Sequence, residues 1–235
     1  MCKIPGWENP DRNLTLELTT GHRVSALLTE APDAFARLVL AHGAGAGMHH
    51  RFMAAVGKGL AHRGVSTLRY QFAYMEAGSK RVDSPPVAHA AVRAAVAAGA
   101  GPLPLFAGGK SFGARMTSQA QALDRLLDIR GLVFFGFPLH PAGKPSIDRA
   151  AHLSDVHISM LFLQGTRDAL ADFGLIETVV AGLGPATSLF AVSDADHSFH
   201  VPARSGRTDA QVLSGMLDEV TGWMRQFVAD ERRGS

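Results

Sequence analysis

The chain has 235 residues, a length that suits one α/β domain built around a single core. Its residues are 46% hydrophobic and 19% charged, which is typical of a globular protein and not of a disordered one. A formal net charge of +2 without a run of lysine or arginine argues against nucleic-acid binding, and the single cysteine, Cys2, argues against a disulfide framework or a thiolate metal site.

The N-terminal part predicts a β-hairpin that leads into a buried strand. Residues 14–19 alternate apolar and polar side chains, Gly21 and His22 form a turn signal, and residues 24–28 supply the second strand. Residues 38–41 are a continuous apolar run, which is typical of a strand covered on both faces. This run ends at the glycine-rich segment His42-Gly43-Ala44-Gly45.

The next segment alternates predicted helices and strands. We expect a helix over residues 51–62, a strand over residues 65–69 and a helix over residues 86–98. Between the last two lies an irregular aromatic stretch, residues 70–76. Because α/β enzymes build substrate pockets after their strands, these rings either line a pocket or cover the edge of the core.

A strand-to-helix turn around Ser111 is the most informative part of the chain. The apolar run at residues 103–107 predicts a buried strand, and residues 112–127 predict a helix. Between them stands Gly109-Lys110-Ser111-Phe112-Gly113, a G-x-S-x-G pentapeptide. In this setting the pentapeptide indicates a nucleophile elbow, which holds a serine hydroxyl exposed at a sharp turn between small residues.

The C-terminal part adds three strands and two helices. The strands are expected at residues 131–137, 158–163 and 187–192, and a helix is expected at residues 173–183. The last helix begins at Thr208, where Gln211 completes a capping box. Such alternation predicts a mostly parallel sheet with helices on both faces, whose carboxyl-terminal edge gathers the chemistry.

Four strands end in reactive or turn-forming residues, and their order resembles a known superfamily. The four ends are His42-Gly43, Ser111, Asp168 and His197. The order serine, acid, histidine resembles the α/β-hydrolase superfamily over residues 14–228. The segments HGAGAGMHH, RYQFAYMEAG, GGKSFGARM, FPLHPAGKP and LFLQGTRD resemble dienelactone-hydrolase-like proteins related to the third subunit of the NSL acetyltransferase complex and to testis-expressed hydrolase-like proteins.

The resemblance implies a catalytic triad of Ser111, His197 and Asp168. A serine hydroxyl is a weak nucleophile until a base takes its proton, and His197 lies on a short polar loop past the last strand. Asp168, directly after its own strand, would orient the imidazole. The alternatives are His200 or His140 as base and Asp172 as acid, whereas Asp194 and Asp196 are expected to shape the histidine loop.

The oxyanion of an acyl-transfer reaction needs two backbone N–H donors. We expect these from Phe112, the residue after the nucleophile, and from Ala44 in the glycine-rich loop. Lys110 and Arg115 flank the elbow, where a solvated or sheet-capping charge is favoured over attraction of an anionic substrate. No metal site is expected at His49 and His50, because adjacent side chains diverge and no carboxylate cluster lies nearby.

These observations predict a single domain over residues 1–235 with an α/β-hydrolase fold. It would have about eight strands in a mostly parallel sheet, helices on both faces, an N-terminal antiparallel hairpin and little or no lid. The predicted function is a serine hydrolase, like a carboxylesterase, that cleaves a small ester, thioester or related acyl substrate through an acyl-serine intermediate. The alternatives are a hydrolase-fold binding or scaffold protein and an acyltransferase using the same triad.

The expected surroundings follow from the same composition. We expect a small-molecule acyl substrate as the partner, no cofactor, no metal, and neither nucleic acid nor membrane; a homodimer is compatible with the sequence. The first thirty residues have no apolar segment of signal-peptide type, so a cytoplasmic location is expected. Pocket rings are expected among Phe52, Phe72, Tyr74, Phe112, Phe173 and Phe199, each of which is equally compatible with the core.

Overall fold

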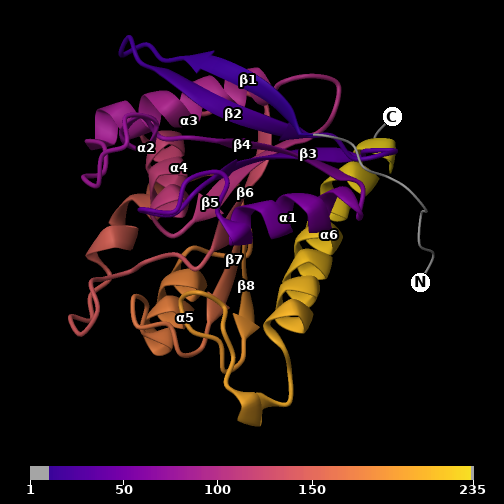
Figure 1. Ribbon diagram of the computed structural model, residues 1–235. Helices are drawn as coiled ribbons and strands as arrows, with labels where there is room; N and C mark the ends of the chain where they lie inside the picture. The colour runs from indigo at the N-terminus through magenta and orange to yellow at the C-terminus, as the bar shows by residue number, and fades with distance from the viewer. Residues whose placement is uncertain (1–10, 234–235) are drawn as a thin grey trace.

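An eight-stranded sheet crosses the molecule in the order β1-β2-β4-β3-β5-β6-β7-β8 (Figure 1). The computed structural model describes residues 11–233, so Cys2 lies outside the described residues. β1 and β2 form the predicted antiparallel hairpin, β2 is also antiparallel to β4, and every other neighbouring pair is parallel. The strands are β1 (Arg12–Glu17), β2 (Arg23–Thr29), β3 (Ala36–Ala41), β4 (Val65–Tyr70), β5 (Leu105–Lys110), β6 (Ile129–Phe135), β7 (Ser159–Gly165) and β8 (Thr187–Val192).

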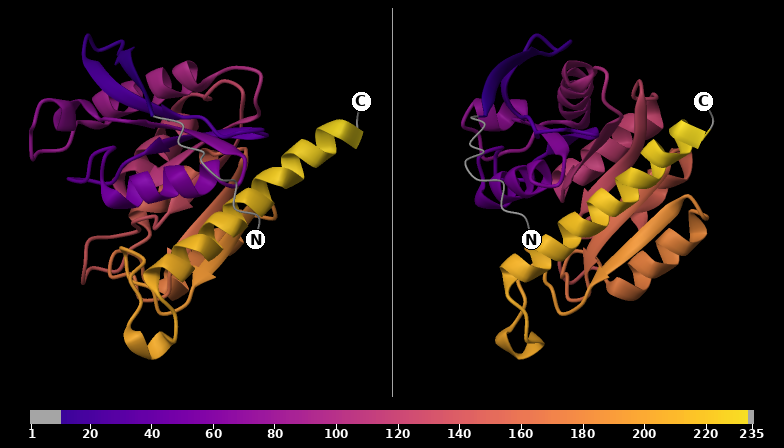
Figure 2. Two further views of the ribbon diagram at one scale, coloured as in Figure 1. Left: turned by 45° about the vertical axis from the view of Figure 1, so that its right-hand side comes forward. Right: turned by 90° about the vertical axis from the view of Figure 1, so that its right-hand side faces the viewer.

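Helices cover both faces of this sheet and bury two apolar cores. On one face α1 and the long α6 pack on β3, β5, β6 and β7. On the other face lie α2 to α5 and the short 3₁₀ segment η1. Figure 2 shows α6 running diagonally along its face. The helices are α1 (Arg51–Ala61), α2 (Ala73–Glu76), α3 (Pro85–Gly99), α4 (Phe112–Leu123), α5 (Phe173–Gly182) and α6 (Asp209–Arg233), with 3₁₀ segments η1 (Asp148–Asp155) and η2 (Ala203–Ser205).

The start of α6 confirms the predicted capping box. The Thr208 N–H donates to the Gln211 side-chain oxygen at 2.8 Å, and the Gln211 N–H donates to the Thr208 hydroxyl at 3.2 Å. Two N–H groups that an α-helix leaves without an intrahelical acceptor are therefore satisfied. The helix then buries one apolar face against the sheet, formed by Val212, Met216, Val220, Trp223 and Met224.

The helix predicted to end at residue 127 ends at Leu123. Asp124 is extended, with φ −162° and ψ 125°, and its N–H makes the last helical bond, to the Ala120 carbonyl oxygen at 3.3 Å. Arg93 of α3 donates to the carbonyl oxygens of Ala120 and Asp124 at 2.6 and 2.8 Å. The chain then turns back, and Leu126 becomes buried while Leu123 is 72% exposed.

The aromatic stretch at residues 70–76 is more regular than its sequence predicts. Tyr70 is the last residue of β4, and residues 73–76 form α2. The Glu76 carboxylate accepts hydrogen bonds from the N–H and hydroxyl of Ser25 at 3.0 and 2.8 Å, which fastens α2 to β2. The rings of Tyr70, Phe72 and Tyr74 are buried, so the stretch covers the core.

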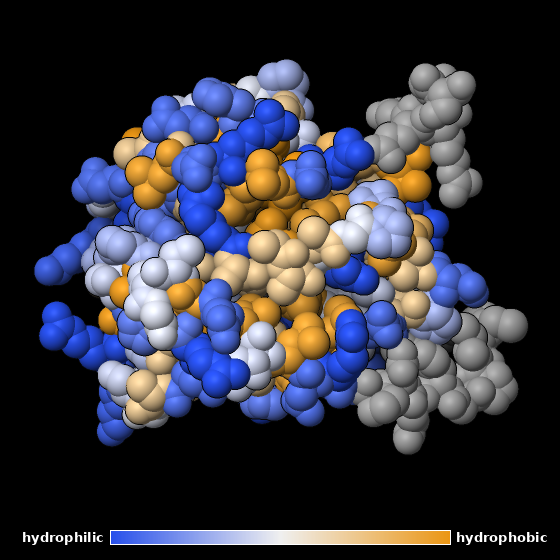
Figure 3. Space-filling view, turned by 90° about the horizontal axis from the view of Figure 1, so that it is seen from above, coloured by the Kyte–Doolittle hydropathy of each residue, from blue (hydrophilic) through white to orange (hydrophobic). Residues whose placement is uncertain are grey.

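The surface on the β1 side of the sheet mixes hydrophobic and hydrophilic residues, with the hydrophobic ones gathered near its middle (Figure 3). Among residues 11–233 there is no helix that is both long enough and apolar enough to cross a membrane. The predicted site residues lie at the carboxyl-terminal edge of the parallel strands. In the strand register Ala41 of β3 pairs with Gly109 of β5, Lys110 with Phe135 of β6, and Phe135 with Leu163 of β7.

Candidate active site

Ser111 occupies the turn between β5 and α4. Its backbone has φ 53° and ψ −112°, a conformation that non-glycine residues rarely adopt and that costs on the order of 1–3 kcal/mol. The pentapeptide glycines make this turn possible. A Cβ on Gly109 would lie 2.7 Å from the Ala41 carbonyl oxygen, and one on Gly113 would lie 2.6 Å from the carbonyl oxygens of Ala41 and His42.

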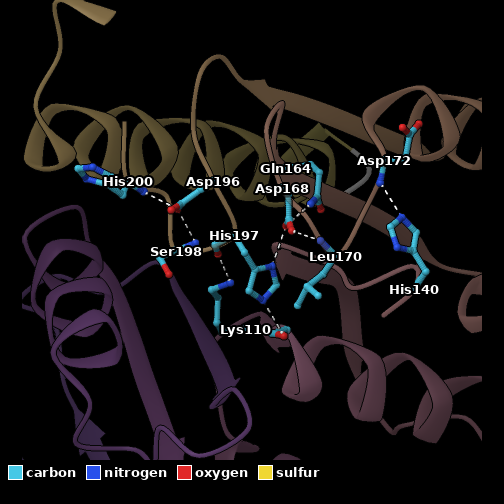
Figure 4. Close-up of polar contacts among 11 residues, drawn as sticks. Lys110, His140, Gln164, Asp168, Leu170, Asp172, Asp196, His197, Ser198 and His200 are labelled. Atoms are coloured by element: carbon cyan, nitrogen blue, oxygen red, sulfur yellow. Dashed lines mark hydrogen bonds and ion pairs between the residues drawn. The ribbon is translucent and has the colours of Figure 1, made fainter. Parts of the chain in front are cut away.

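His197 bridges Ser111 and Asp168. Its Nε2 lies 2.9 Å from the Ser111 hydroxyl, and its Nδ1 lies 2.7 Å from Oδ2 of Asp168 (Figure 4). Because the carboxylate can only accept, Nδ1 carries the proton and Nε2 is left free to accept from the serine hydroxyl. Residues 86 and 29 positions apart in sequence thus form one hydrogen-bonded chain.

Asp168 is held rigidly in this chain. Its side chain is fully buried, and its Oδ2 also accepts from the Gln164 amide at 2.7 Å. Its Oδ1 accepts from the Leu170 N–H at 2.8 Å. Three donors therefore hold the carboxylate beside the imidazole, where it can stabilise a positive charge.

The alternative acids and bases lie outside the chain of hydrogen bonds. His200 pairs with Asp209 at the start of α6, at 2.9 Å, and its side chain is 65% exposed. His140 accepts from the Asp172 N–H at 2.9 Å, and Asp172 itself caps α5 by accepting from the Leu175 N–H. His140 and Asp172 thus shape the loop after β7.

The histidine loop is shaped by Asp196, as the sequence predicts. Its Oδ1 accepts from the N–H groups of Ser198 and His200 at 2.7 and 3.0 Å. Asp194 adopts a positive φ of 61°, and its N–H donates to the Thr166 hydroxyl, which joins this loop to the end of β7. These contacts hold the backbone on both sides of His197.

The two predicted oxyanion donors lie beside Ser111. Phe112 is in the first turn of α4, where N–H groups have no intrahelical acceptor. The Ala44 N–H donates to no other group within residues 11–233. A Cβ on Gly43 would lie 3.7 Å from the Ser111 Cβ, so the glycine-rich loop passes directly over the elbow.

A set of side chains that the sequence analysis did not assign holds this loop. His42 is fully buried, its Nδ1–H donates to the Gly43 carbonyl at 2.7 Å, and its Nε2 accepts from the Phe72 N–H at 3.1 Å. Burial lowers the pKa of His42 to about 4, although the bond to Gly43 opposes this, so the ring is neutral. The only sequence signal for this role is that His42 ends a buried strand.

The stretch after β4 supplies the remaining contacts to the loop. The Tyr74 hydroxyl accepts from the Gly45 N–H at 3.0 Å, and the Gln71 amide oxygen accepts from the Met48 N–H at 2.8 Å. The Tyr74 ring packs against Phe112. The aromatic segment thus acts as a support for the glycine-rich loop, which explains its place directly after a central strand.

A pocket of about 330 Å³ opens at the Ser111 hydroxyl. Its volume is at the low end for ligand sites. Of the six rings expected here, Phe52 alone lines it, stacked on the buried ring of Phe199. Within residues 11–233, no group of three or more His, Cys, Asp or Glu side chains is arranged to hold a metal ion. The lining residues are Gly43, Ala44, Ala46, His50, Phe52, Met53, Lys110, Ser111, Leu170, His197 and Ser198.

Lys110 and Arg115, the two cations that flank the nucleophile turn, differ in their contacts. The expectation that Lys110 is a solvated or sheet-capping charge is wrong, because its ammonium donates to the His197 carbonyl oxygen at 2.6 Å. Arg115 does not line the pocket. Burial lowers the pKa of Arg115, and the nearby Arg149 adds to this.

A second serine and histidine pair lies behind the site. The Ser118 hydroxyl is 2.7 Å from Nε2 of His152, but it also donates to the Arg115 carbonyl oxygen at 3.0 Å. Ser118 is fully buried within α4, and neither residue lines the pocket. This pair therefore serves helix packing and provides a natural control for experiments on Ser111.

Comparisons with known proteins show the family and the fold of this chain. The sequence profile of the Alpha/beta hydrolase domain family matches residues 34–225. The fold is similar to a lidless α/β serine hydrolase from Xanthomonas campestris, with a TM-score of 0.69, 22% identity, and coverage of 93% of this chain and 97% of that one. It is also similar to an esterase domain from a Rhodothermus marinus protein (TM-score 0.71, 14% identity, 93% and 99% coverage) and to a dienelactone hydrolase from Anabaena variabilis (TM-score 0.71, 15% identity, 92% and 97% coverage).

These comparisons confirm the predicted fold. The eight-stranded, mostly parallel sheet, its N-terminal antiparallel pair and its two helical layers are those of an α/β hydrolase with little or no lid. The segment between β6 and β7 contains a loop and the short η1, as expected for an open site.

Proposed function

Because the chain belongs to the alpha/beta hydrolase domain family, we propose that it is a serine hydrolase that cleaves a small ester, thioester or related acyl substrate. The observation that carries the proposal is the hydrogen-bonded chain from Asp168 through His197 to Ser111, with distances of 2.7 and 2.9 Å, at the mouth of a pocket. A packing role alone has no need for this geometry at a half-buried, strained serine that lines a pocket.

The proposed reaction begins with attack of the Ser111 oxygen on the acyl carbon. His197 Nε2 takes the hydroxyl proton, and Asp168 stabilises the imidazolium that results. The carbonyl oxygen becomes an oxyanion that accepts from the N–H groups of Phe112 and Ala44. Collapse of the tetrahedral intermediate breaks the bond to the alcohol or thiol, which leaves with the proton held by His197. A water then repeats these steps on the acyl-Ser111 ester and releases the acid.

The pocket favours a small acyl group without charge. Its volume of about 330 Å³ lies at the low end of the range for ligand sites, and Ala44, Ala46, Phe52, Met53 and Leu170 make much of its wall apolar. An acyl chain would lie against these side chains with its carbonyl at Ser111. The proposed partner is therefore a small-molecule acyl substrate.

A closer kinship with dienelactone-hydrolase-like proteins, including the relatives of the NSL-complex subunit and the testis-expressed proteins, is part of this proposal. It is supported by the sequence segments around His42, Ser111 and Asp168. The nucleophile of dienelactone hydrolases proper is a cysteine, whereas this chain has Ser111, which favours an ester or thioester over a dienelactone.

The proposal is tested by hydrolysis of a series of p-nitrophenyl acyl esters from acetyl to decanoyl. Wild type and Ser118→Ala are expected to turn over the short esters best, and Ser111→Ala is expected to lose turnover by roughly 10⁴-fold or more. Transfer of the acyl group to an added alcohol or amine in preference to water would point to the acyltransferase alternative. A folded wild type without turnover of any ester or thioester would overturn the proposal and favour a binding or scaffold role.

A further inference from the structure

Lys110 directly precedes Ser111, the proposed nucleophile, yet its side chain contacts the loop that carries His197, the proposed base. It is the last residue of β5, and its backbone pairs with Phe135 of β6. The side chain extends to the loop after β8, where its ammonium donates to the backbone carbonyl oxygen of His197 at 2.6 Å (Figure 4). One bond thus joins the strand that carries Ser111 to the loop that carries His197.

The Lys110 ammonium lies close to Asp168 and His197, in space that is open because Gly136 has no side chain. A Cβ on Gly136 would lie 2.9 Å from the Lys110 nitrogen, 3.6 Å from Oδ2 of Asp168 and 3.6 Å from Cε1 of His197. The same nitrogen lies 5.1 Å from the centre of the Phe199 ring. Cation, carboxylate and imidazole therefore surround the backbone of Gly136.

We propose that Lys110 is a positioning residue, whose ammonium tethers the His197 backbone so that the imidazole stays within reach of both Ser111 and Asp168. This inference rests on the proposed function, because it assigns a role in the same reaction. A hydrogen bond from an ionised donor is about twice as strong as a neutral one, and a displacement of about 1 Å at a catalytic group can cost roughly 100-fold in rate.

The charge state of Lys110 gives the tether an alkaline limit. Burial lowers the pKa of Lys110 from 10.5 to about 8, while the carboxylates of Asp168 and Asp196 oppose this shift. The groups that face the ammonium are these two carboxylates, from the loops after β7 and β8, and His197 itself. Above pH 8 the neutral amine makes a weaker bond to the carbonyl.

From about pH 8 to pH 10.5, the contribution of Lys110 to the free energy of unfolding rises, whereas its contribution to kcat is expected to fall. Between about pH 8 and pH 10.5 the unfolded chain keeps the Lys110 proton while the folded protein has lost it. This group therefore adds stability as pH rises through the window. A fall in kcat above pH 8 that is caused by Lys110 is thus separable from alkaline unfolding.

The variants Lys110→Met and Lys58→Met test the proposal. Lys58 lies exposed on α1 and serves as the matched control. We expect Lys110→Met to lower kcat roughly 10- to 100-fold with KM within about twofold of wild type, and to remove any fall of kcat near pH 8. Lys58→Met is expected to match wild type. A loss carried by KM, or wild-type kcat in Lys110→Met, overturns the proposal.

A measurement without substrate keeps this test separate from the proposed function. In proton NMR, the strongly deshielded proton between His197 Nδ1 and Asp168 is expected in wild type and in Lys58→Met, and is expected to broaden or disappear in Lys110→Met. An unchanged resonance overturns the positioning role, whether or not the protein hydrolyses esters. If Lys110→Met does not fold, the wild-type kcat profile decides: a flat profile from pH 7 to pH 10 overturns the proposal.

Discussion

Replacing Gly113 with alanine tests the close packing of the nucleophile turn against the glycine-rich loop. Gly113 is in the first turn of α4, two residues after Ser111. A Cβ there would lie 2.6 Å from the carbonyl oxygens of both Ala41 and His42. Because both contacts are backbone atoms, no side-chain rotation can relieve them.

The magnitude of the effect follows from this overlap. Real Cβ atoms essentially never approach another heavy atom within 3.0 Å, so α4 and the end of β3 must separate by several tenths of an ångström. Overpacking of this kind costs roughly 1–3 kcal/mol, or a Tm lower by about 2–12 °C in a chain of this size. His42 begins the glycine-rich loop, which carries the proposed oxyanion donor Ala44, and a shift there is expected to lower kcat roughly 10- to 100-fold.

The assay combines thermal unfolding with steady-state ester hydrolysis. Gly222→Ala is the matched control, because Gly222 is exposed within α6 and a Cβ there meets nothing within 4 Å. An alanine at that position is expected to raise stability by about 0.5–1 kcal/mol and to leave kcat unchanged. The reasoning is refuted if Gly113→Ala has the Tm and kcat of wild type.

Three further predictions concern the loop and the base. Tyr74→Phe removes the acceptor for the Gly45 N–H, so kcat is expected to fall about 2- to 10-fold with little change in KM; unchanged kinetics would speak against the support role. His200→Gln breaks the exposed pair with Asp209, yet ester turnover should stay within about twofold of wild type, and its loss would reopen the choice of base. Burial lowers the pKa of His42 to about 4, so below pH 6.5 the unfolded chain binds a proton at this residue that the folded protein does not. His42 is therefore expected to make the free energy of unfolding about 2 kcal/mol smaller at pH 5 than at pH 7, as measured by urea unfolding. Equal free energies at the two pH values would contradict a buried neutral His42.

Local patterns predicted most of the fold. Continuous apolar runs predict β3, β5, β6 and β7 because these strands are buried on both faces. The capping box of Thr208 and Gln211 predicts the start of α6. The end of α4 differs from the prediction, because Asp124 leaves the helical conformation where Arg93, from another helix, donates to the carbonyl oxygens of Ala120 and Asp124. No pattern within α4 encodes that contact.

The candidate site likewise has a part that local sequence patterns predict and a part that they do not. Ser111, Asp168 and His197 could be predicted because each lies at or shortly after the end of a strand, and parallel strands bring their carboxyl ends to one edge. The tether from Lys110 was not predicted, because it spans 87 residues and is made to a backbone carbonyl that any residue could offer. The contacts that His42 and Tyr74 make to the glycine-rich loop were not predicted either, since a buried residue after an apolar strand and a ring in an aromatic stretch both resemble ordinary core.

Labelling with a fluorophosphonate probe, followed by mass-spectrometric mapping of the modified peptide, tests the central claim most directly. The account predicts one label per chain on Ser111 in wild type and in Ser118→Ala. It predicts no label in Ser111→Ala and a rate of labelling lowered by several orders of magnitude in His197→Ala, because the hydroxyl then has no base. A folded wild type that stays unlabelled, or that carries its label on another residue, would contradict the assignment of Ser111 as an activated nucleophile.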